Sequence, residues 1–139
     1  MREILFKAKR IDNGEWIEGH YTECRGETFI GIDTSSMFEI FCPPVIRWFK
    51  VSSETICQFT GFCDKNGKKI WENDILMAHL DESYPENATY ETVEWGVAGW
   101  VTHEAGSIDR EYLDEFDLEH FEVVGNIFYN KELLQEERR

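Results

Sequence analysis

Four histidines and an excess of carboxylates are the side chains of this chain with the types needed for chemistry. His79, His103 and His120, together with a carboxylate, could ligate zinc or another divalent ion. Their spacing does not support such a site, because no two histidines stand at i and i+4 and no His-x-Glu precedes a Cys-x-x-Cys pair. We therefore expect these histidines and His20 to pack or face solvent. We expect no metal and no other cofactor, and a small metal-dependent enzyme stays open as an alternative.

Other catalytic patterns are equally weak. Carboxylates suited to glycoside hydrolysis are so abundant that they single out no pair. The chain contains no Gly-x-Ser-x-Gly, no P-loop and no Gly-x-Gly-x-x-Gly. Asp64-x-Asn66-Gly67 is similar to the start of an EF-hand loop, but its glycine falls at the fourth position and Ile75 stands where the last ligand would be. We predict no catalytic residue and no enzyme.

The net charge of −14 comes from one segment. Between Trp71 and Gly125 the chain has fifteen Asp or Glu residues and one base, Arg110, whereas acids and bases balance in the rest. Such a field repels phosphate backbones, so direct binding of nucleic acid is disfavoured. The densest part is a possible acidic interaction patch made of Asp109, Glu111, Asp114, Glu115, Asp117, Glu119 and Glu122. Solubility alone, a basic partner and a nucleic-acid mimic all remain open as its purpose.

The composition is that of a folded chain of 139 residues. Hydrophobic residues make up 42% and aromatic residues 14%, which requires a core or an interface. The N-terminal residues lack the apolar stretch of a signal peptide, and no run is long enough to span a membrane. We expect a soluble, cytoplasmic protein without membrane contact. Its cysteines, Cys24, Cys42, Cys57 and Cys63, should then remain thiols and pack as small apolar residues.

Three tight turns are predicted. Asn13-Gly14 and Asn66-Gly67 each stand between strand-like runs and favour two-residue type I′ hairpins, in which both central residues have positive φ. The second turn would place Asp64 opposite Lys69 and Cys63 opposite Ile70. At Asn73-Asp74 we expect Asn73 to adopt the left-handed backbone and Asp74 to accept hydrogen bonds from free N–H groups. These six residues are structural turn positions, with no role in reactivity.

The remaining pattern predicts a mainly β chain. Around the first turn, Ile4, Phe6 and Ala8 should share a face with Ile17, Gly19 and Tyr21. Further strands are expected at 28–32, 37–41, 45–51, 89–97, 99–104 and 121–127. We expect Asp109 to Glu119 to form one or two helical turns, and Asn130 to cap a short helix over 131–137. The domain organisation predicted is an N-terminal antiparallel lobe over 1–55 and a second lobe over 56–139.

Three blocks carry a resemblance to a known family. They are the start, REILFKAKRIDNGEWIEG, the middle, QFTGFCDKNGKKIWENDIL, and the end, FEVVGNIFYNKELL. The pattern T-G-x-x-D-x-x-G-x-x-I-aromatic-E-x-D-I, followed by V-V-G-N-I and E-L-L, resembles the YopX family of phage and prophage proteins. The resemblance implies a mainly β fold with a small SH3-like β-barrel. Together with the strand pattern, the fold expected is an antiparallel meander, this barrel and a short C-terminal helix. The resemblance implies no catalytic residues. This chain departs from the family pattern at Asn73, where the family tends to have a glycine.

Three functions are compatible with these observations. The first is a non-enzymatic phage accessory protein, a binding or self-assembling module that forms a homo-oligomer or contacts a host or phage protein. The second is an acidic decoy that mimics nucleic acid and inhibits a host DNA-binding or restriction protein. The third is the small metal-dependent enzyme considered above. We expect the first.

Overall fold

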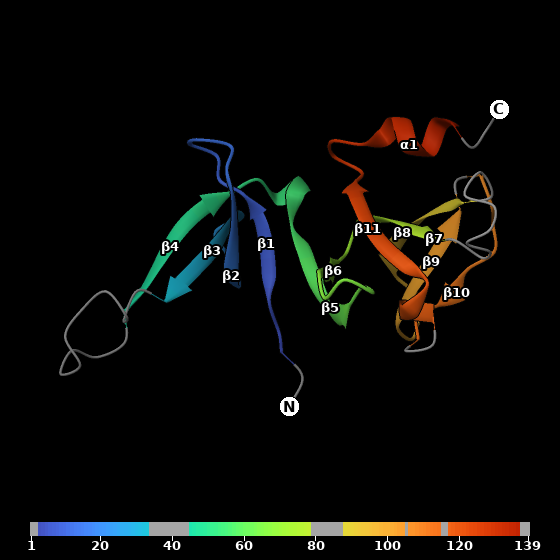
Figure 1. Cartoon of the computed structure of the whole chain (residues 1–139). Helices are drawn as coiled ribbons and strands as arrows, with labels where there is room; N and C mark the ends of the chain where they lie inside the picture. The colour runs from blue at the N-terminus through green and yellow to red at the C-terminus, as the bar shows by residue number, and fades with distance from the viewer. Residues whose placement is uncertain (1–2, 34–44, 79–87, 105, 115–116, 137–139) are drawn as a thin grey trace. The chain divides into compact units, whose positions relative to one another are not determined.

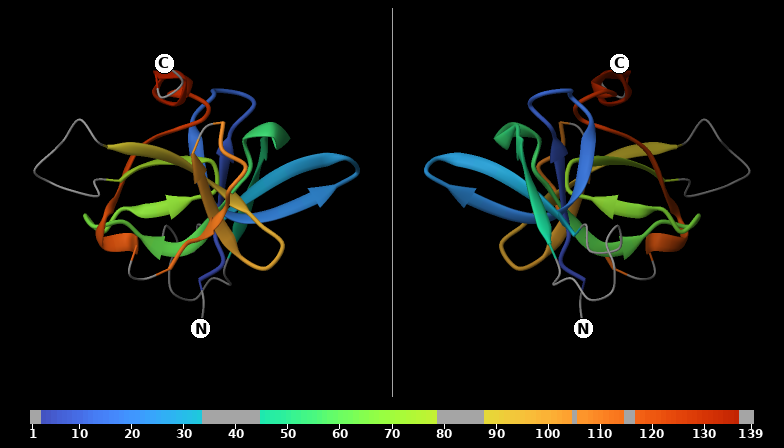
Figure 2. Two further views of the ribbon diagram at one scale, coloured as in Figure 1. Left: turned by 90° about the vertical axis from the view of Figure 1, so that its right-hand side faces the viewer. Right: turned by 90° about the vertical axis from the view of Figure 1, so that its left-hand side faces the viewer.

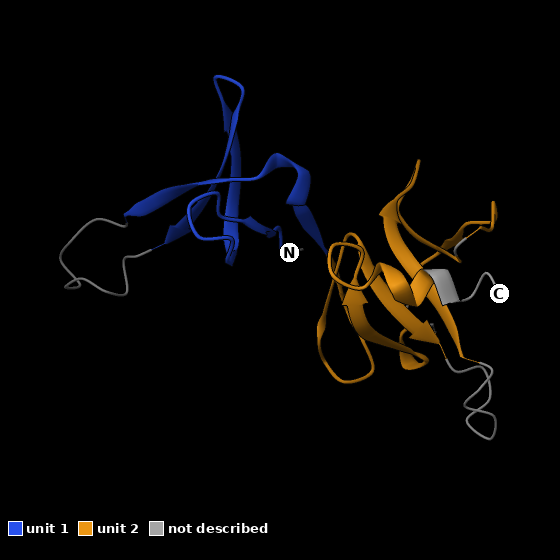
Figure 3. Cartoon of the chain, turned by 90° about the horizontal axis from the view of Figure 1, so that it is seen from above, with its two compact units in different colours: residues 1–59 blue, residues 60–139 orange. Residues whose placement is uncertain are grey.

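The computed structural model describes residues 3–33, 45–78, 88–104, 106–114 and 117–136. The chain forms two compact units, residues 1–59 and 60–139 (Figure 3). The division lies between Phe59 and Thr60, inside a strand, whereas the sequence placed it between residues 55 and 56. Of the described helices, none is long and apolar enough to cross a membrane.

The first unit is an antiparallel meander (Figures 1 and 2). Its sheet has the order β4-β3-β2-β1-β5, and a single 3₁₀ turn, η2, precedes the last strand. The elements are β1 (Phe6–Lys9), β2 (Trp16–Cys24), β3 (Glu27–Asp33), β4 (Ile46–Val51), η2 (Ser53–Thr55) and β5 (Cys57–Cys63). The predicted strand over 37–41 lies outside the described residues.

One face of this sheet is buried. Ala8, Ile30 and Val51 form the centre of the core, and Phe6, Ile17 and Ile56 pack against them. Phe6 and Ala8 stand two positions apart in β1 and therefore share this face, and Ile56 joins it from the segment between η2 and β5. The sheet also curls, since Arg10 forms an isolated bridge with Val51 at the far end of β4.

The first hairpin corrects the predicted turn. Only Gly14 has a positive φ, of 72°, so Asn13-Gly14 is not a type I′ turn. Four residues, 11–14, connect the strands, because the N–H of Arg10 donates to the carbonyl of Glu15 and that of Gly14 donates to the carbonyl of Arg10. Phe6 consequently lies opposite Gly19, two positions from the register that a two-residue turn would set. A shift of two preserves the faces, so the predicted grouping of Phe6 and Ala8 with Ile17 and Gly19 is confirmed.

The second unit is built on a five-stranded antiparallel sheet with the order β10-β9-β8-β7-β11. Its elements are β6 (Lys69–Trp71), β7 (Asp74–Ala78), β8 (Thr89–Trp95), β9 (Trp100–Glu104), β10 (Glu111–Tyr112), the 3₁₀ turn η4 (Asp117–Glu119), β11 (Phe121–Asn126) and α1 (Lys131–Glu136). Strand β6 pairs with the end of β5.

Apolar side chains on the inner face of this sheet form the core of the unit. Ile70, Leu76, Val93 and Trp100 are buried there with Ala78, Leu113 and Phe121. The mainly β fold with antiparallel sheets and a short C-terminal helix is therefore confirmed. Among the described strands, β10 and β11 remain the two edges of their sheet, so a closed barrel is not observed.

The Asn66-Gly67 turn also differs from the prediction. Gly67 has a φ of 81° while Asn66 does not have a positive φ, which excludes a type I′ turn. The N–H of Gly67 donates to the carbonyl of Asp64, and the N–H of Asp64 donates to the carbonyl of Lys68. Three residues thus form the loop and Asp64 lies opposite Lys68 instead of Lys69. Since Cys63 is exposed and Ile70 is buried, these two side chains do not share a face, as the predicted register required.

The Asn73-Asp74 turn is as predicted. Asn73 has a φ of 72°. A carboxylate oxygen of Asp74 accepts a hydrogen bond of 2.8 Å from the N–H of Trp71, and the side chain is buried. The backbone of Asn73 also joins two strands, because its N–H donates to Val93 and its carbonyl accepts from Ile127. Both residues are corners of the fold.

Several local predictions differ from the structure in the second unit. The described part of residues 109–119 contains one helical turn, the 3₁₀ turn η4, but Tyr112 lies in the two-residue strand β10 and not in a helical turn. Strand β8 ends at Trp95, so Val97 lies in the turn. The side chain of Asn130 accepts from the N–H of Asn126 and does not cap α1. Of the described cysteines, which are all free thiols, Cys57 is buried and Cys24 and Cys63 are exposed.

Candidate functional site

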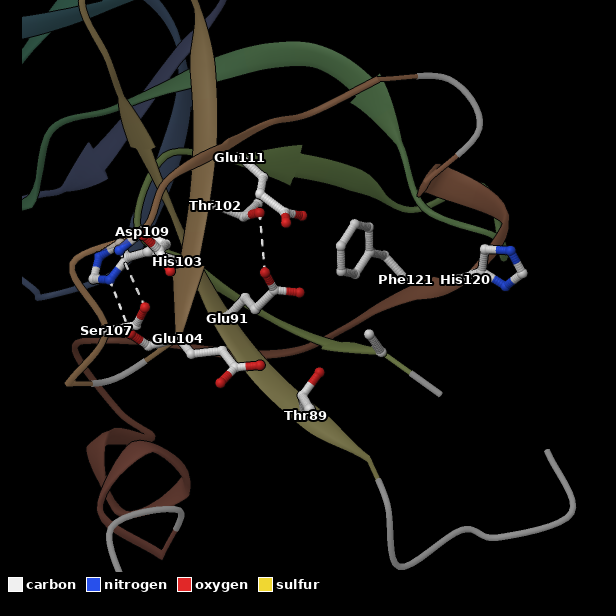
Figure 4. A pocket seen from close by; sticks show the side chains of 11 residues that line it. Thr89, Glu91, Thr102, His103, Glu104, Ser107, Asp109, Glu111, His120 and Phe121 are labelled. Atoms are coloured by element: carbon white, nitrogen blue, oxygen red, sulfur yellow. Dashed lines mark hydrogen bonds between the residues drawn. The ribbon is translucent and has the colours of Figure 1, made fainter. Parts of the chain in front are cut away.

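A hollow with many polar side chains lies on the inner face of the five-stranded sheet in the second unit. Its volume is about 370 Å³ (Figure 4). We call it the acidic hollow, and its lining residues are Ala78, Thr89, Glu91, Thr102, His103, Glu104, Ser107, Asp109, Glu111, His120 and Phe121. Strands β7 to β11 supply most of them, so the walls are held by the sheet itself.

Strand register brings three glutamates to one face. Glu91 of β8 lies directly opposite Glu104 of β9, and Glu111 of β10 lies opposite Thr102. Glu91 is also two positions from Val93, which is completely buried in the core. Because residues i and i+2 share a face of a strand, the glutamates continue the same inner face that carries the apolar core. The core thus gives way to carboxylates at one end of the sheet.

This arrangement is electrostatically unfavourable in the free protein. Like charges directly opposite each other on antiparallel strands destabilise a sheet. The hydroxyl of Thr102, a buried residue, donates to Glu91 at 3.2 Å and offsets part of the cost for that carboxylate. Within the described residues, neither Glu104 nor Glu111 has a Lys, Arg or His partner for its carboxylate. The hollow therefore offers negative charge to a group that enters it.

Two of the four histidines line the hollow, at different places. Nδ1 of His103 lies 3.1 Å from the carbonyl oxygen of Glu104, and because a carbonyl only accepts, this nitrogen carries a proton. Nε2 lies 3.0 Å from the Thr92 hydroxyl and 3.4 Å from a carboxylate oxygen of Glu94. The ring is thereby fixed. His120 is exposed just before β11, and Figure 4 shows it well apart from His103.

The donor set of the described chain does not assemble a metal site. No three His, Cys, Asp or Glu side chains within the described ranges are close enough together to hold an ion. His79 lies outside the described residues, and His20 is exposed on β2 of the first unit.

The predicted acidic patch is divided among several surfaces. Asp109 and Glu111 line the acidic hollow, and Asp114 and Glu119 are exposed elsewhere. Glu122 lies on β11, 3.9 Å from the ammonium nitrogen of Lys65. Glu115 lies outside the described residues, and Asp117 begins η4. Of the described members, only two therefore belong to the hollow.

Glu91 and Glu104 are the site residues that the sequence did not reveal. The alternation of Thr89 to Trp95 does place Glu91 on the face of Val93, and this was the available signal: a carboxylate at an inward position of a strand. The partner Glu104 could not be found in the same way, because the register of β8 and β9 depends on the turn between them. Long-range pairing with β10 and β11 completes the hollow.

Comparisons with known proteins agree with the observed fold. The family model described as YopX protein matches residues 3–135. Among solved structures, the chain is similar to the crystal structure of protein EF1440 from Enterococcus faecalis, with a TM-score of 0.51 and 24% sequence identity. That likeness covers 96% of this chain and 99% of the other, and at this identity it concerns the fold alone. No curated protein matches the chain.

Proposed function

Because this chain belongs to the YopX family, we propose that it is a phage or prophage accessory protein that acts as a non-enzymatic binding module in the bacterial cytoplasm. The alignment of Glu91, Glu104 and Glu111 on one face of the sheet carries the proposal. Maintaining like charges side by side costs stability, and a cationic ligand would recover that cost on binding. The expected ligand is a lysine- or arginine-rich segment of a host or phage protein.

The fold suits this role. We propose that the second unit is a small SH3-like barrel whose end is open at the acidic hollow. Strands β8 and β9 pair on both sides and hold Glu91 and Glu104 in fixed positions, so little ordering of these two side chains is needed when a ligand binds. Self-association into a homo-oligomer is compatible with the same function.

The test compares two double variants in a capture experiment. Glu104→Gln with Glu111→Gln removes two carboxylates from the hollow, while Glu18→Gln with Glu54→Gln removes two exposed ones from the first unit. Immobilised protein is exposed to host lysate at low salt and at high salt. We expect a partner that the wild type and the control variant retain at low salt, that the hollow variant loses, and that high salt releases. Equal capture by both variants would refute the role of the hollow.

A nucleic-acid decoy is the second candidate, and the distribution of charge favours it. The second unit has nineteen Asp and Glu residues and seven Lys and Arg residues, so it carries −12 of the net charge of −14. A decoy would occupy the DNA-binding surface of its partner, and duplex DNA would then displace the captured protein in proportion to its concentration. A partner that binds DNA and this chain at the same time would exclude the decoy function. The proposal of a binding module would not be affected.

A further inference from the structure

A second concave surface lies at the turn between β8 and β9, on the other face of the sheet from the acidic hollow. It has a volume of about 350 Å³. We call it the tip groove, and its lining residues are Glu94, Gly96, Val97, Val101, Arg110 and Tyr112. Glu94, Val101 and Tyr112 lie on the same face of the sheet, because Glu94 is opposite Val101 and Val101 is opposite Tyr112 in the strand register.

The groove and its surroundings expose large apolar side chains. Val97 is 101% exposed and Tyr112 is 58% exposed. Val101 is buried and forms the floor. Isolated apolar residues are normal on a surface, but several around one concavity indicate an interaction site. Tyr is also among the residues that most often anchor interfaces.

The polar edge of the groove is already neutral. The guanidinium of Arg110 donates to the carboxylate of Glu94 and to the carbonyl of Ser107. The other oxygen of Glu94 faces His103. Arg110 is the single base between Trp71 and Gly125, so this pairing leaves the surrounding acids without compensation from that segment. The apolar groove thus belongs to a unit whose net charge is −12.

We propose that the tip groove holds an apolar side chain of a lysine- or arginine-rich segment of a partner protein. The inference rests on the function proposed above and adds the feature that selects one basic segment among many. Charge complementarity with the acidic unit attracts any polybasic chain. Burial of one apolar side chain against Val97, Val101 and Tyr112 then favours the segment that carries such a side chain over other polybasic segments.

Residues 109–112 let a single ligand reach both surfaces. Asp109 and Glu111 line the acidic hollow, whereas Arg110 and Tyr112 line the tip groove. This alternation is that of an extended strand, with successive side chains on opposite faces. Since β10 is an edge of its sheet, a segment that passes over this edge can place its cations at the carboxylates and its apolar residue in the groove.

The test uses two synthetic fluorescent peptides that differ at one position. Both are twelve-residue chains of lysine, serine and glycine, and one has a central leucine where the other has serine. Fluorescence anisotropy gives the dissociation constant of each with the full chain. We expect the leucine peptide to bind at least about tenfold more tightly, which corresponds to burial of one aliphatic side chain.

Variants assign this difference to the groove. Val97→Ser and Tyr112→Ser should each remove most of the advantage of the leucine peptide. Ile11→Ser, at an apolar position in the first unit that is as exposed as Tyr112, should leave the advantage of the leucine peptide unchanged. Because Val97 is fully exposed, its substitution does not endanger folding, and circular dichroism verifies this for all three variants.

The outcomes separate this inference from the proposed function. If both peptides bind equally and the double variant Glu104→Gln, Glu111→Gln binds neither, the role of the acidic hollow is supported and the role of the tip groove is refuted. If neither peptide binds, the proposed function is contradicted as well. If Val97→Ser instead abolishes a concentration-dependent dimer measured by light scattering, a second copy of the chain is the occupant and the inference is wrong.

Discussion

The carboxylate of Asp64 accepts a hydrogen bond of 2.9 Å from the N–H of Val123, a residue 59 positions later in the chain. Its other oxygen accepts from the N–H groups of Asn66 and Lys68, each at 2.9 Å. One buried side chain thus closes the turn after β5 and attaches that turn to β11. The carboxylate of Asp64, which superficially resembles a calcium ligand, thus accepts hydrogen bonds from three backbone N–H groups.

Asp64→Ala should therefore be strongly destabilising. The substitution leaves three N–H groups without their acceptor, and hydrogen bonds to a charged group contribute more than neutral ones, so we expect a loss of about 3 kcal/mol in the free energy of unfolding. Urea denaturation followed by tryptophan fluorescence measures it. Glu18→Ala, at an exposed position, serves as the control with a change near zero. A similar small change for Asp64→Ala would show that the hydrogen bonds are replaced by water.

Asn73→Gly should be neutral or mildly stabilising, because glycine adopts a φ of 72° without steric cost. Asn73→Val should lower the stability, because a β-branched residue tolerates positive φ poorly. Thermal unfolding of both variants gives the comparison. Equal tolerance of glycine and valine would contradict the assignment of this corner.

Gly19→Ala should disrupt the first unit. A Cβ at this position would collide with the carbonyl oxygen of Gly31, which belongs to the backbone of the neighbouring strand β3. Backbone cannot move aside as a flexible side chain does, so we expect a loss of about 2 kcal/mol or more. Gly31→Ala is the comparison, because the three atoms nearest to its Cβ would belong to the side chains of Ile46 and Trp48. The smaller loss expected for Gly31→Ala is measured by the same denaturation curves.

Glu104→Gln should raise the stability while it weakens binding. The substitution removes the repulsion from Glu91 on the opposite strand, which is worth about 0.2–1 kcal/mol. In the wild type, added salt should produce part of the same gain by screening. Thermal unfolding with and without salt tests both statements. A loss of stability in the variant would mean that the two carboxylates share a favourable contact.

The pKa of Asp12 should lie below that of an ordinary aspartate, because its side chain accepts hydrogen bonds from Arg10 and is attracted by that guanidinium charge. A depressed pKa in the folded state stabilises the protein above the unfolded pKa, and this contribution disappears as the pH falls through the depressed value. Asp12 is fully exposed, so the effect on unfolding is small. Carbon-detected NMR titration should show the pKa rising in Arg10→Gln. An unchanged pKa in that variant would exclude the Arg10 contact as the cause.

Local patterns predicted most of the strands and two details of the turns. Positive φ at Asn73 and capping by Asp74 follow from side-chain chemistry within four residues, and alternation correctly assigned the buried face of the first hairpin. The turn types at Asn13 and Asn66 were wrong, because the asparagine-glycine pair also fits longer loops in which only glycine has positive φ. Competing loop lengths differ little in local energy, and tertiary pairing selects among them.

Only part of the candidate site could be predicted from the sequence. Asp109 and Glu111 belonged to the predicted patch, while Glu91 and Glu104 required the pairing of β8 with β9. One of the helical turns expected within 109–119 is present as η4. Tyr112, whose helical spacing with Leu113 and Phe116 suggested the other, lies in β10, because the pairing of β10 with β9 overrides that preference. The exposure of Val97 could not be predicted, since the end of β8 is set by the turn that follows.

The alternation of residues 109–112 makes the length of the preceding loop a determinant of binding. Deleting one residue between Glu104 and Asp109 would, if strand pairing is kept, exchange the two sets of side chains, so that acids face the groove and Arg110 and Tyr112 enter the hollow. Relatives that differ here by an odd number of residues should therefore prefer ligands of a different kind, even where every side chain is conserved.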